Sequence, residues 1–242
     1  TLTEDRFGNQ MNSYLFTREL NQDISISATP LLNNISNITI SLLVNLNSYG
    51  EAGQSGYNHY INKTSQIGAP DGFVFANNTT QLYFYHGDGT NFYFTNNLPA
   101  LGYWSNLVVS YNYDATSSEN SYCKFYINGL LKDEFQTYQG LGDVGANILI
   151  GKYSTEYYNR LDGKIDNIGI WNRALTEQEV ANLYASNSSN ECSTLVINTG
   201  ILSTNPVTYN STVNIYPNPA NDQITIDCGN LDNVEGWNIK IT

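Results

Sequence analysis

One carboxylate stands out in this sequence because its predicted surroundings are apolar. Asp166 has the same strand parity as Ile168 and Ile170, which predicts a carboxylate on the buried face of a strand. A buried carboxylate must be paired, protonated or bound to a cation, and oxygen-rich sites suit Ca²⁺. We therefore predict a structural Ca²⁺ at Asp166. The alternative is a carboxylate bonded to backbone amides or to Arg173.

Aromatic side chains gather in segments that we expect to be loops. Such rings suit neutral sugars, because an aromatic face stacks on the sugar ring while nearby polar groups orient the hydroxyls. The predicted ligand-binding residues are Tyr57, His59, Tyr60, Tyr85, His86, Asp88, Tyr157, Tyr158 and Arg160. A tyrosine-rich surface without a ligand is the alternative. Trp104 and Trp171 are expected to be core or half-buried residues.

The sequence offers no catalytic constellation. Glycoside hydrolysis needs two carboxylates about 5–10 Å apart around one sugar, and helix capping explains Glu177 and Glu179. Two histidines and no Gly-x-Ser-x-Gly motif argue against a serine triad. Phosphate loops and dinucleotide fingerprints are absent from the sequence. We predict that the chain is not an enzyme.

Alternation with period two predicts strands along most of the chain. In Asn37–Asn47, apolar residues at every second position indicate a strand with one buried face. Asn128-Gly129 tolerates positive φ at both turn centres and predicts a type I′ hairpin. The other predicted strands are Phe73–Phe75, Leu82–Tyr85, Phe92–Phe94, Leu107–Tyr111, Tyr122–Ile127, Leu130–Phe135, Ala146–Tyr153 and Lys164–Trp171. This spacing predicts an all-β sandwich.

One helix is predicted after these strands. Thr176 and Glu179 have the spacing of a capping box, in which each side chain bonds to the other residue's amide. Val180, Leu183 and Tyr184 follow at helical spacing, so we expect about two turns packed on the sandwich.

Composition excludes several classes of function. The 242 residues carry a net charge of −12, and 35 of them are asparagine and 19 tyrosine. The lack of a basic cluster argues against nucleic acid and anionic membranes as partners. No apolar run approaches the ~20 residues of a membrane span. Few charges with many neutral polar and aromatic residues favour an extracellular β protein.

The three cysteines are too scattered for a zinc site or a disulfide scaffold. Cys123 lies in a strand pattern and is predicted to be a buried free thiol. Pairing of Cys192 with Cys228 stays open.

The composition changes after Ser186, which suggests three segments. Residues 1–186 contain the strand series, and residues 187–212 form a linker rich in Ser, Thr and Asn with one short predicted strand, Leu195–Ile197. Residues 213–242 begin a second strand pattern, with alternation around Ile215, Ile226 and Ile239. This last unit is too short to bury a core alone.

Residues Ser36 to Ala185 resemble the laminin-G-like, concanavalin-A-like jelly roll of bacterial surface and secreted proteins. The matching stretches are Gly72-Phe73, Trp104, Lys124–Leu131, Ile148–Lys152 and Leu161–Tyr184. The resemblance implies a jelly-roll β-sandwich with a concave face, a role in carbohydrate binding, adhesion or structure, and a structural Ca²⁺ near the last strand. The family's usual first strand is missing before Asp5–Asn9, so we expect a truncated N-terminus. Laminarinase-type hydrolases share this fold, but their E-x-D-x-x-E stretch does not occur here.

Residues 213–242 resemble the start of the C-terminal sorting domain of type IX secretion substrates in Bacteroidetes. The specific match is VNIYPNPANDQITID, Val213 to Asp227, and Trp237–Thr242 continues it. The resemblance implies the type IX secretion machinery as a partner and a secreted or cell-surface protein. The second half of that domain is absent, so we expect only a partial sorting domain.

The predicted function is a non-catalytic secreted or cell-surface module for carbohydrate binding or adhesion. One alternative is a structural spacer of a larger adhesin without a small ligand. A weaker alternative is a glycoside hydrolase of the laminarinase type.

Overall fold

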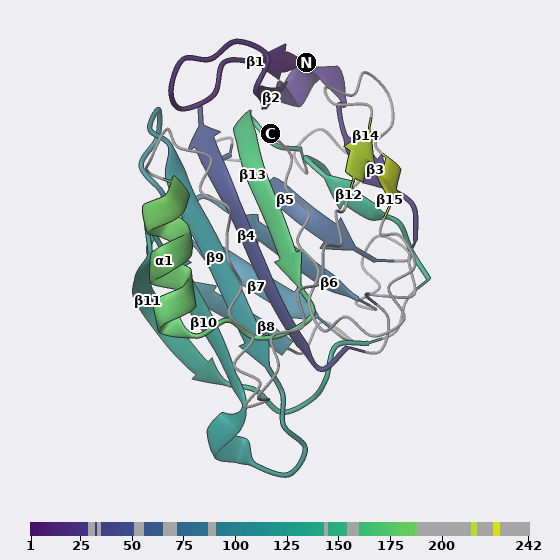
Figure 1. The fold of residues 1–242 in the computed structure, drawn as a ribbon, viewed down its shortest axis with the longest axis vertical. Coiled ribbons are helices and arrows are strands. Elements are labelled where there is room, and N and C mark those ends of the chain that lie inside the picture. Colours follow the sequence, from purple (N-terminus) through teal and green to yellow (C-terminus); the bar gives the residue numbers. More distant parts are fainter. Residues whose placement is uncertain are drawn as a thin grey trace, which may run out of the picture.

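Two antiparallel sheets face each other in the computed structural model, with one helix against the outside of one sheet (Figure 1). The structure describes residues 1–28, 32, 35–50, 56–64, 72–86, 91–142, 145–153, 160–187, 214–216 and 225–227. The observed β-sandwich confirms the predicted all-β jelly-roll fold.

The strand order in each sheet differs from the order in the sequence, as expected for a jelly roll. The seven-stranded sheet contains, in spatial order, β1 (Leu2–Thr3), β2 (Ser13–Phe16), β13 (Gly163–Trp171), β4 (Asn37–Leu46), β9 (Ser105–Asn112), β10 (Tyr122–Ile127) and β11 (Leu130–Gln136). The six-stranded sheet contains β3 (Ile24–Ile26), β12 (Ile148–Ile150), β5 (Asn58–Lys63), β6 (Phe73–Asn77), β7 (Leu82–His86) and β8 (Asn91–Thr95).

The core lies between the two sheets and follows the period of two. In β4, every second residue from Ile38 to Leu46 is fully buried in it. Across from β4, Phe75 of β6 and Phe84 of β7 are also fully buried in the core. Cys123 of β10 is a buried free thiol in this layer, which confirms its prediction.

The β10–β11 hairpin closes as the Asn-Gly pair predicts. Asn128 and Gly129 have φ values of 53° and 74°, the left-handed conformation that a type I′ turn requires. The Asn128 side chain also accepts a hydrogen bond from the Asn106 amide at 2.9 Å, which ties the turn to β9.

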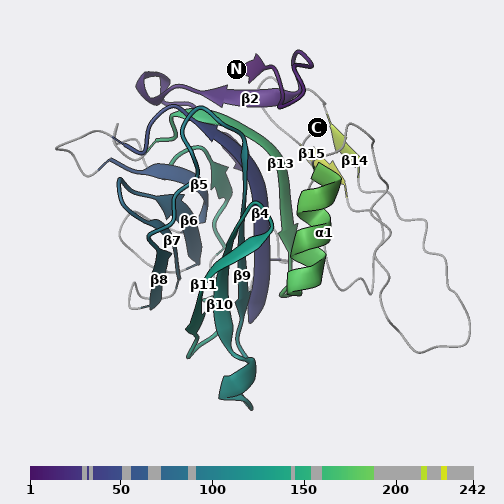
Figure 2. The same ribbon diagram turned by 90° about the vertical axis from the view of Figure 1, so that its left-hand side faces the viewer.

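Helix α1 (Glu177–Asn187) is one turn longer than predicted and packs on the outer face of the seven-stranded sheet (Figure 2). Val180 and Leu183 contact the buried rings of Tyr126 and Trp171. The position of Trp171 matches the prediction of a core residue, and Trp104 is half-buried as expected.

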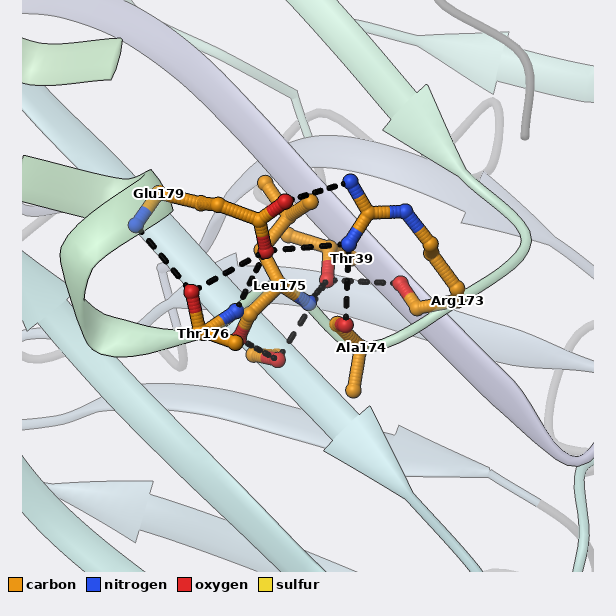
Figure 3. Close-up of polar contacts among 7 residues, drawn as sticks. Thr39, Arg173, Ala174, Leu175, Thr176 and Glu179 are labelled. Carbon is orange, nitrogen blue, oxygen red and sulfur yellow. Dashed lines mark hydrogen bonds and ion pairs between the residues drawn. The ribbon is translucent and has the colours of Figure 1, made fainter. Parts of the chain in front are cut away.

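The segment before α1 is fixed to the sheet by hydrogen bonds (Figure 3). The Thr39 hydroxyl of β4 donates to the Arg173 carbonyl at 2.9 Å and accepts from the Leu175 amide at 2.9 Å. The Glu179 carboxylate accepts a hydrogen bond from the Thr176 backbone amide at 2.8 Å, and the Thr176 hydroxyl accepts one from the Glu179 backbone amide at 3.2 Å. These two bonds confirm the capping box.

Glu179 also forms a two-point ion pair that the sequence pattern did not predict. Arg173 donates to its two carboxylate oxygens at 2.9 and 2.7 Å. The hydrogen bonds from Arg173 are the main cause that lowers the pKa of Glu179 to about 2, and the Thr176 amide adds to the effect.

We predict that Glu179→Gln lowers the free energy of unfolding at pH 7 by about 1 kcal/mol, because it weakens both the cap and a water-screened ion pair. The folded pKa lies below the ordinary value of 4.5, so the carboxylate stabilises the fold fully above about pH 4.5. That contribution disappears as the pH falls toward 2. Urea unfolding of both proteins at pH 7 and pH 3 measures this, and an equal difference at the two pH values would contradict it.

Two short strands outside the sandwich, β14 (Asn214–Tyr216) and β15 (Thr225–Asp227), pair antiparallel. They coincide with the alternation predicted around Ile215 and Ile226. The predicted strand Leu195–Ile197 and both Cys192 and Cys228 lie outside the described residues. Within the described part, no helix is both long and apolar enough to cross a bilayer.

Candidate functional site: an aromatic face on the six-stranded sheet

The side of the six-stranded sheet that faces away from the core carries a second cluster of rings. In β7, Leu82 and Phe84 belong to the core, whereas Tyr83 and Tyr85 belong to this separate cluster. We define the aromatic face as Tyr57, His59, Tyr83, Tyr85, Phe92, Phe94 and Tyr153. Val74 and Ala76 of β6 lie between these rings and are fully buried.

Ring contacts connect the aromatic face across four strands. Tyr153, which follows β12, stacks on His59 of β5 with ring centroids 4.9 Å apart. Tyr83 of β7 meets Tyr57 edge-on at 6.1 Å and stacks on Phe92 of β8 at 5.1 Å. Such contacts hold the rings in fixed orientations, so the face is preorganised for a flat, partly apolar ligand.

The rings differ in exposure, and this decides which of them a ligand can reach. Tyr83 and His59 are buried at 3% exposure, so they support their neighbours. Tyr57, Tyr85, Phe94 and Tyr153 are half-buried, and Phe92 is 43% exposed. The accessible rings therefore lie at both sides of the buried Tyr83.

The hydroxyls of Tyr83 and Tyr85 stay protonated over the physiological range. Burial raises the pKa of Tyr83 well above 10, and neighbouring tyrosines add to this. Burial also raises the pKa of Tyr85, with a further contribution from its hydrogen bond with Tyr153. These hydroxyls can therefore donate as well as accept hydrogen bonds, which suits the hydroxyl groups of sugars.

A buried arginine fixes one border of the aromatic face. Arg18, only 2% exposed, donates to the Tyr57 carbonyl at 3.0 Å and to the Asn58 side-chain oxygen at 2.9 Å. Arg160 in turn donates to the Arg18 carbonyl at 3.2 Å. The Arg18 guanidinium thus holds Tyr57 and the start of β5 in place.

Asn58 connects this border to the seven-stranded sheet. Its side-chain oxygen also accepts a hydrogen bond from the Asp162 backbone amide at 3.0 Å, and its side-chain nitrogen donates one to the Ser48 carbonyl at 2.7 Å. The Asp162 carboxylate accepts from Asn47 at 3.0 Å and from the Ser48 hydroxyl at 2.8 Å. The rigid part of the sandwich therefore determines where Tyr57 lies.

The structure brings together only some of the predicted ligand-binding residues. Tyr57, His59 and Tyr85 lie in the aromatic face, and Arg160 lies beside it. Asp88, Tyr157 and Tyr158 lie outside the described residues.

Tyr60 and His86 are placed differently from the prediction. Both were expected in loops, but Tyr60 lies in β5 and His86 ends β7, and both are fully buried. Tyr60 follows the outward-facing His59 and so faces the core, and the β5–β6 register shift between His59 and Ile61 lets Ile61 face the core as well. The His86 ring packs edge-on against Tyr111 of the core at 4.6 Å. Neither side chain is therefore placed to contact a ligand.

The sequence reasoning missed Tyr83, Phe92, Phe94, Tyr153 and the positioning residue Arg18. For Tyr83 a signal existed: it alternates with the core residues Leu82 and Phe84, so it had to occupy the opposite face. For Arg18 there was none, because its partners are 39 and 40 residues away.

Asp166 lies on the opposite side of β13 from its predicted position. A register shift between Asp166 and Gly169, with Asn167 at φ 46°, inserts an extra residue. Ile168 and Ile170 therefore face the core, whereas Asp166 pairs in register with Leu43, which lies outside the core cluster. The parity argument for Asp166 was wrong because it assumed a regular strand.

Arg6 and a backbone amide contact this carboxylate, and the amide agrees with the alternative prediction of a carboxylate bonded to backbone amides or to Arg173. Asp166 is 4% exposed, and the Arg6 guanidinium lies 3.4 Å from one of its oxygens. The other oxygen accepts from the Asn167 amide at 2.8 Å. Within the described residues no group of three or more His, Cys, Asp or Glu side chains could hold a metal ion. The groups that contact the carboxylate are Arg6 and the Asn167 amide, and calcium at Asp166 stays a prediction from the sequence.

The loop that presents Arg6 is organised by Asp5. The Asp5 carboxylate accepts from the Phe7 and Asn9 amides at 2.8 and 2.9 Å and from the Asn9 and Asn12 side chains at 3.0 and 3.3 Å. Burial raises the pKa of Asp5, but these hydrogen bonds outweigh it and lower the pKa below its ordinary value. The loop between β1 and β2 is therefore closed around Asp5.

We predict that Arg6→Ala lowers the free energy of unfolding by about 1–2 kcal/mol, because it leaves the buried Asp166 with less compensation. If Arg6 supplies the positive charge, EGTA and added Ca²⁺ leave the melting temperature of the wild-type protein unchanged. Calorimetry measures both effects. A melting temperature that rises with Ca²⁺ and falls with EGTA would show that an ion balances the carboxylate.

Comparisons with known proteins agree with this fold. Residues 18–181 match the Laminin_G_3 family of the concanavalin A-like lectin/glucanases superfamily. The chain belongs to this family. No curated protein gave a significant match.

Several solved structures share the fold at low sequence identity. The binding domain of Paraclostridial Mosquitocidal Protein 1 is 16% identical with a TM-score of 0.60, and the match covers 77% of this chain and 45% of that one. Domain 4 of AbnA, an extracellular GH43 arabinanase from Geobacillus stearothermophilus solved with arabinotriose, is 18% identical with a TM-score of 0.51 over 76% and 87%. A heptameric SAP-like pentraxin from Limulus polyphemus is 12% identical with a TM-score of 0.50 over 68% and 82%. At these identities the likeness shows the fold alone, and the chain spans less than half of the first structure.

Proposed function

We propose that this protein is a non-catalytic module that binds neutral carbohydrate on its aromatic face. The observation that carries the proposal is a cluster of seven rings on the outer side of the six-stranded sheet, made of tyrosine, phenylalanine and histidine side chains only. Accessible rings can stack on the apolar face of a sugar, while tyrosine hydroxyls bond to its hydroxyl groups.

The spacing of the accessible rings favours an oligosaccharide over a single sugar. Tyr57, directly before β5, and Phe92 of β8 each contact Tyr83, at 6.1 and 5.1 Å between ring centroids. A ligand that reaches both rings must therefore extend past Tyr83. The likeness in fold to Domain 4 of AbnA, a domain solved with arabinotriose, supports a ligand of this class.

The sequence supports a binding role, because glycoside hydrolysis requires two carboxylates around the scissile bond and no pair with that spacing is recognisable in it. The sequence also lacks the E-x-D-x-x-E stretch of laminarinase-type enzymes. The purified chain is therefore not expected to release sugar from β-glucans. Release of reducing ends would contradict this and support the hydrolase alternative.

We predict that Tyr57→Ala and Tyr85→Ala each weaken binding to the best oligosaccharide of a glycan array by about tenfold, or about 1.4 kcal/mol, because each removes a stacking surface. Tyr138→Ala is the matched control, since Tyr138 is a 71% exposed tyrosine outside the aromatic face. Isothermal titration calorimetry measures the affinities.

An array on which the wild-type chain binds nothing would favour a structural spacer of a larger adhesin. If Tyr57→Ala and Tyr138→Ala lose the same affinity for the oligosaccharide, the binding site lies outside the aromatic face.

We further propose that the protein is secreted or displayed on the cell surface through the type IX machinery. The support is the resemblance of residues 213–242 to a sorting domain, in which Asn214–Tyr216 and Thr225–Asp227 pair as strands. Fractionation of the producing bacterium tests this: we expect the protein in the medium or on the surface, and confinement to the cytoplasm would contradict it.

A further inference from the structure

One buried ring lies at the centre of the aromatic face. Tyr83 of β7 is 3% exposed, and its ring contacts four other rings of the face. Toward β5 these are Tyr57 and His59, whose centroids lie 6.1 and 6.5 Å from that of Tyr83. The other two are Phe92 of β8 at 5.1 Å and Tyr85 of the same strand at 6.1 Å. Because Tyr83 is itself too buried to stack on a sugar, any effect that it has on binding passes through its neighbours.

The small side chain of Ala76 lets the Tyr83 ring reach across β6. Ala76 is fully buried and lies in register with His59 on one side and with Tyr83 on the other. Strands two places apart in a sheet are separated by about 9–10 Å. The centroids of His59 and Tyr83 are only 6.5 Å apart, so these two rings lean toward each other above Ala76. The Tyr83 hydroxyl also lies 3.4 Å from Nε2 of His59.

The accessible rings on the two sides of Tyr83 belong to distant parts of the sheet. Tyr57 directly precedes β5, and Arg18 donates a hydrogen bond to its carbonyl. Phe92 lies in β8, which β6 and β7 separate from β5. Tyr57 and Phe92 therefore have Tyr83 as a common neighbour. Since close-packed side chains transmit displacements to one another, a change at either ring reaches the other through Tyr83.

We propose that Tyr83 is a positioning residue that couples the two ends of the sugar site, so that the contributions of Tyr57 and Phe92 to binding depend on each other. This coupling rests on the proposed function, because it needs Tyr57 and Phe92 to stack on the sugar. An oligosaccharide that extends past Tyr83 uses both preorganised rings, whereas a monosaccharide at one ring gains nothing from the other. The coupling thus adds to the preference for oligosaccharides.

A double-mutant cycle of sugar affinity, measured by isothermal titration calorimetry, tests the coupling. We expect Tyr57→Ala and Phe92→Ala each to weaken binding of the oligosaccharide selected on the glycan array by about tenfold. Independent rings would give a loss of about 100-fold in the double variant, whereas coupled rings give less than about 30-fold. The reason is that removal of one ring loosens Tyr83 and with it the other ring. A double loss equal to the product of the single losses would overturn the proposal.

Variants of Tyr83 separate a positioning role from a general loss of stability. Tyr83→Leu removes the ring and is expected to weaken binding at least tenfold, whereas Tyr83→Phe keeps the ring contacts and stays within about threefold of the wild-type affinity. The matched control is Tyr126→Leu, because Tyr126 is a 1% exposed tyrosine beneath α1, on the outer face of the other sheet. Equal losses of affinity in Tyr83→Leu and Tyr126→Leu would show a general effect on the fold and contradict the positioning role.

Nuclear magnetic resonance of the ring protons tests the coupling without any sugar. We expect Tyr57→Ala to shift the ring signals of Phe92, and the same substitution in a Tyr83→Leu chain to leave them in place. Tyr138→Ala is the control, since Tyr138 lies outside the aromatic face and is 71% exposed. Phe92 signals that do not respond to Tyr57→Ala would overturn the coupling. A wild-type chain that shows the coupled shifts but binds no oligosaccharide would contradict the proposed function alone.

Discussion

The two-sided geometry of a β-strand is the constraint on which the rest of this structure depends. A strand that places Leu82 and Phe84 in the core must place Tyr83 and Tyr85 on the opposite side of the sheet. The same rule applied to β5 and β8 gathers rings that are far apart in the sequence, such as His59 and Phe92, which both contact Tyr83. The aromatic face is therefore a direct consequence of how the core is filled.

The outer faces of the two sheets differ in what covers them. On the seven-stranded sheet, α1 covers Tyr126 and Trp171, and Thr39 and Glu179 fix the segment that leads into the helix. On the six-stranded sheet, no described helix covers the rings, so Phe92 keeps much of its surface exposed. The rings that stay accessible on this side are Phe92 and the half-buried Tyr57, Tyr85, Phe94 and Tyr153, and the buried Arg18 fixes Tyr57.

Regular elements could be predicted from the sequence, whereas irregular ones could not. The strands β4, β7, β9 and β10 follow clear alternation, and Asn128-Gly129 specifies its own turn. β5 was missed because all six of its residues are buried, so no polar face marks the period. The single extra residue at Asn167 reversed the predicted orientation of Asp166, since a strand's parity inverts at a bulge.

The candidate site was predicted in kind but only partly in position. Tyr57, His59 and Tyr85 were identified by ring chemistry, which is local information. The contacts that decide exposure are not local: Tyr111 covers His86, and Asn77 accepts the Tyr60 hydroxyl, so both predicted residues belong to the core. Arg18 acts on Tyr57 only because the fold places them together.

The central claim, that the aromatic face binds neutral oligosaccharide, is tested most directly by nuclear magnetic resonance of the ring protons. A neutral oligosaccharide selected on the glycan array is titrated into the wild-type chain, and the assigned tyrosine and phenylalanine signals are followed. The account predicts saturable shifts for Tyr57, Tyr85 and Phe92, with Tyr103 and Tyr138 unchanged. Shifts confined to Tyr103, Tyr138 or the rings beneath α1 would contradict it.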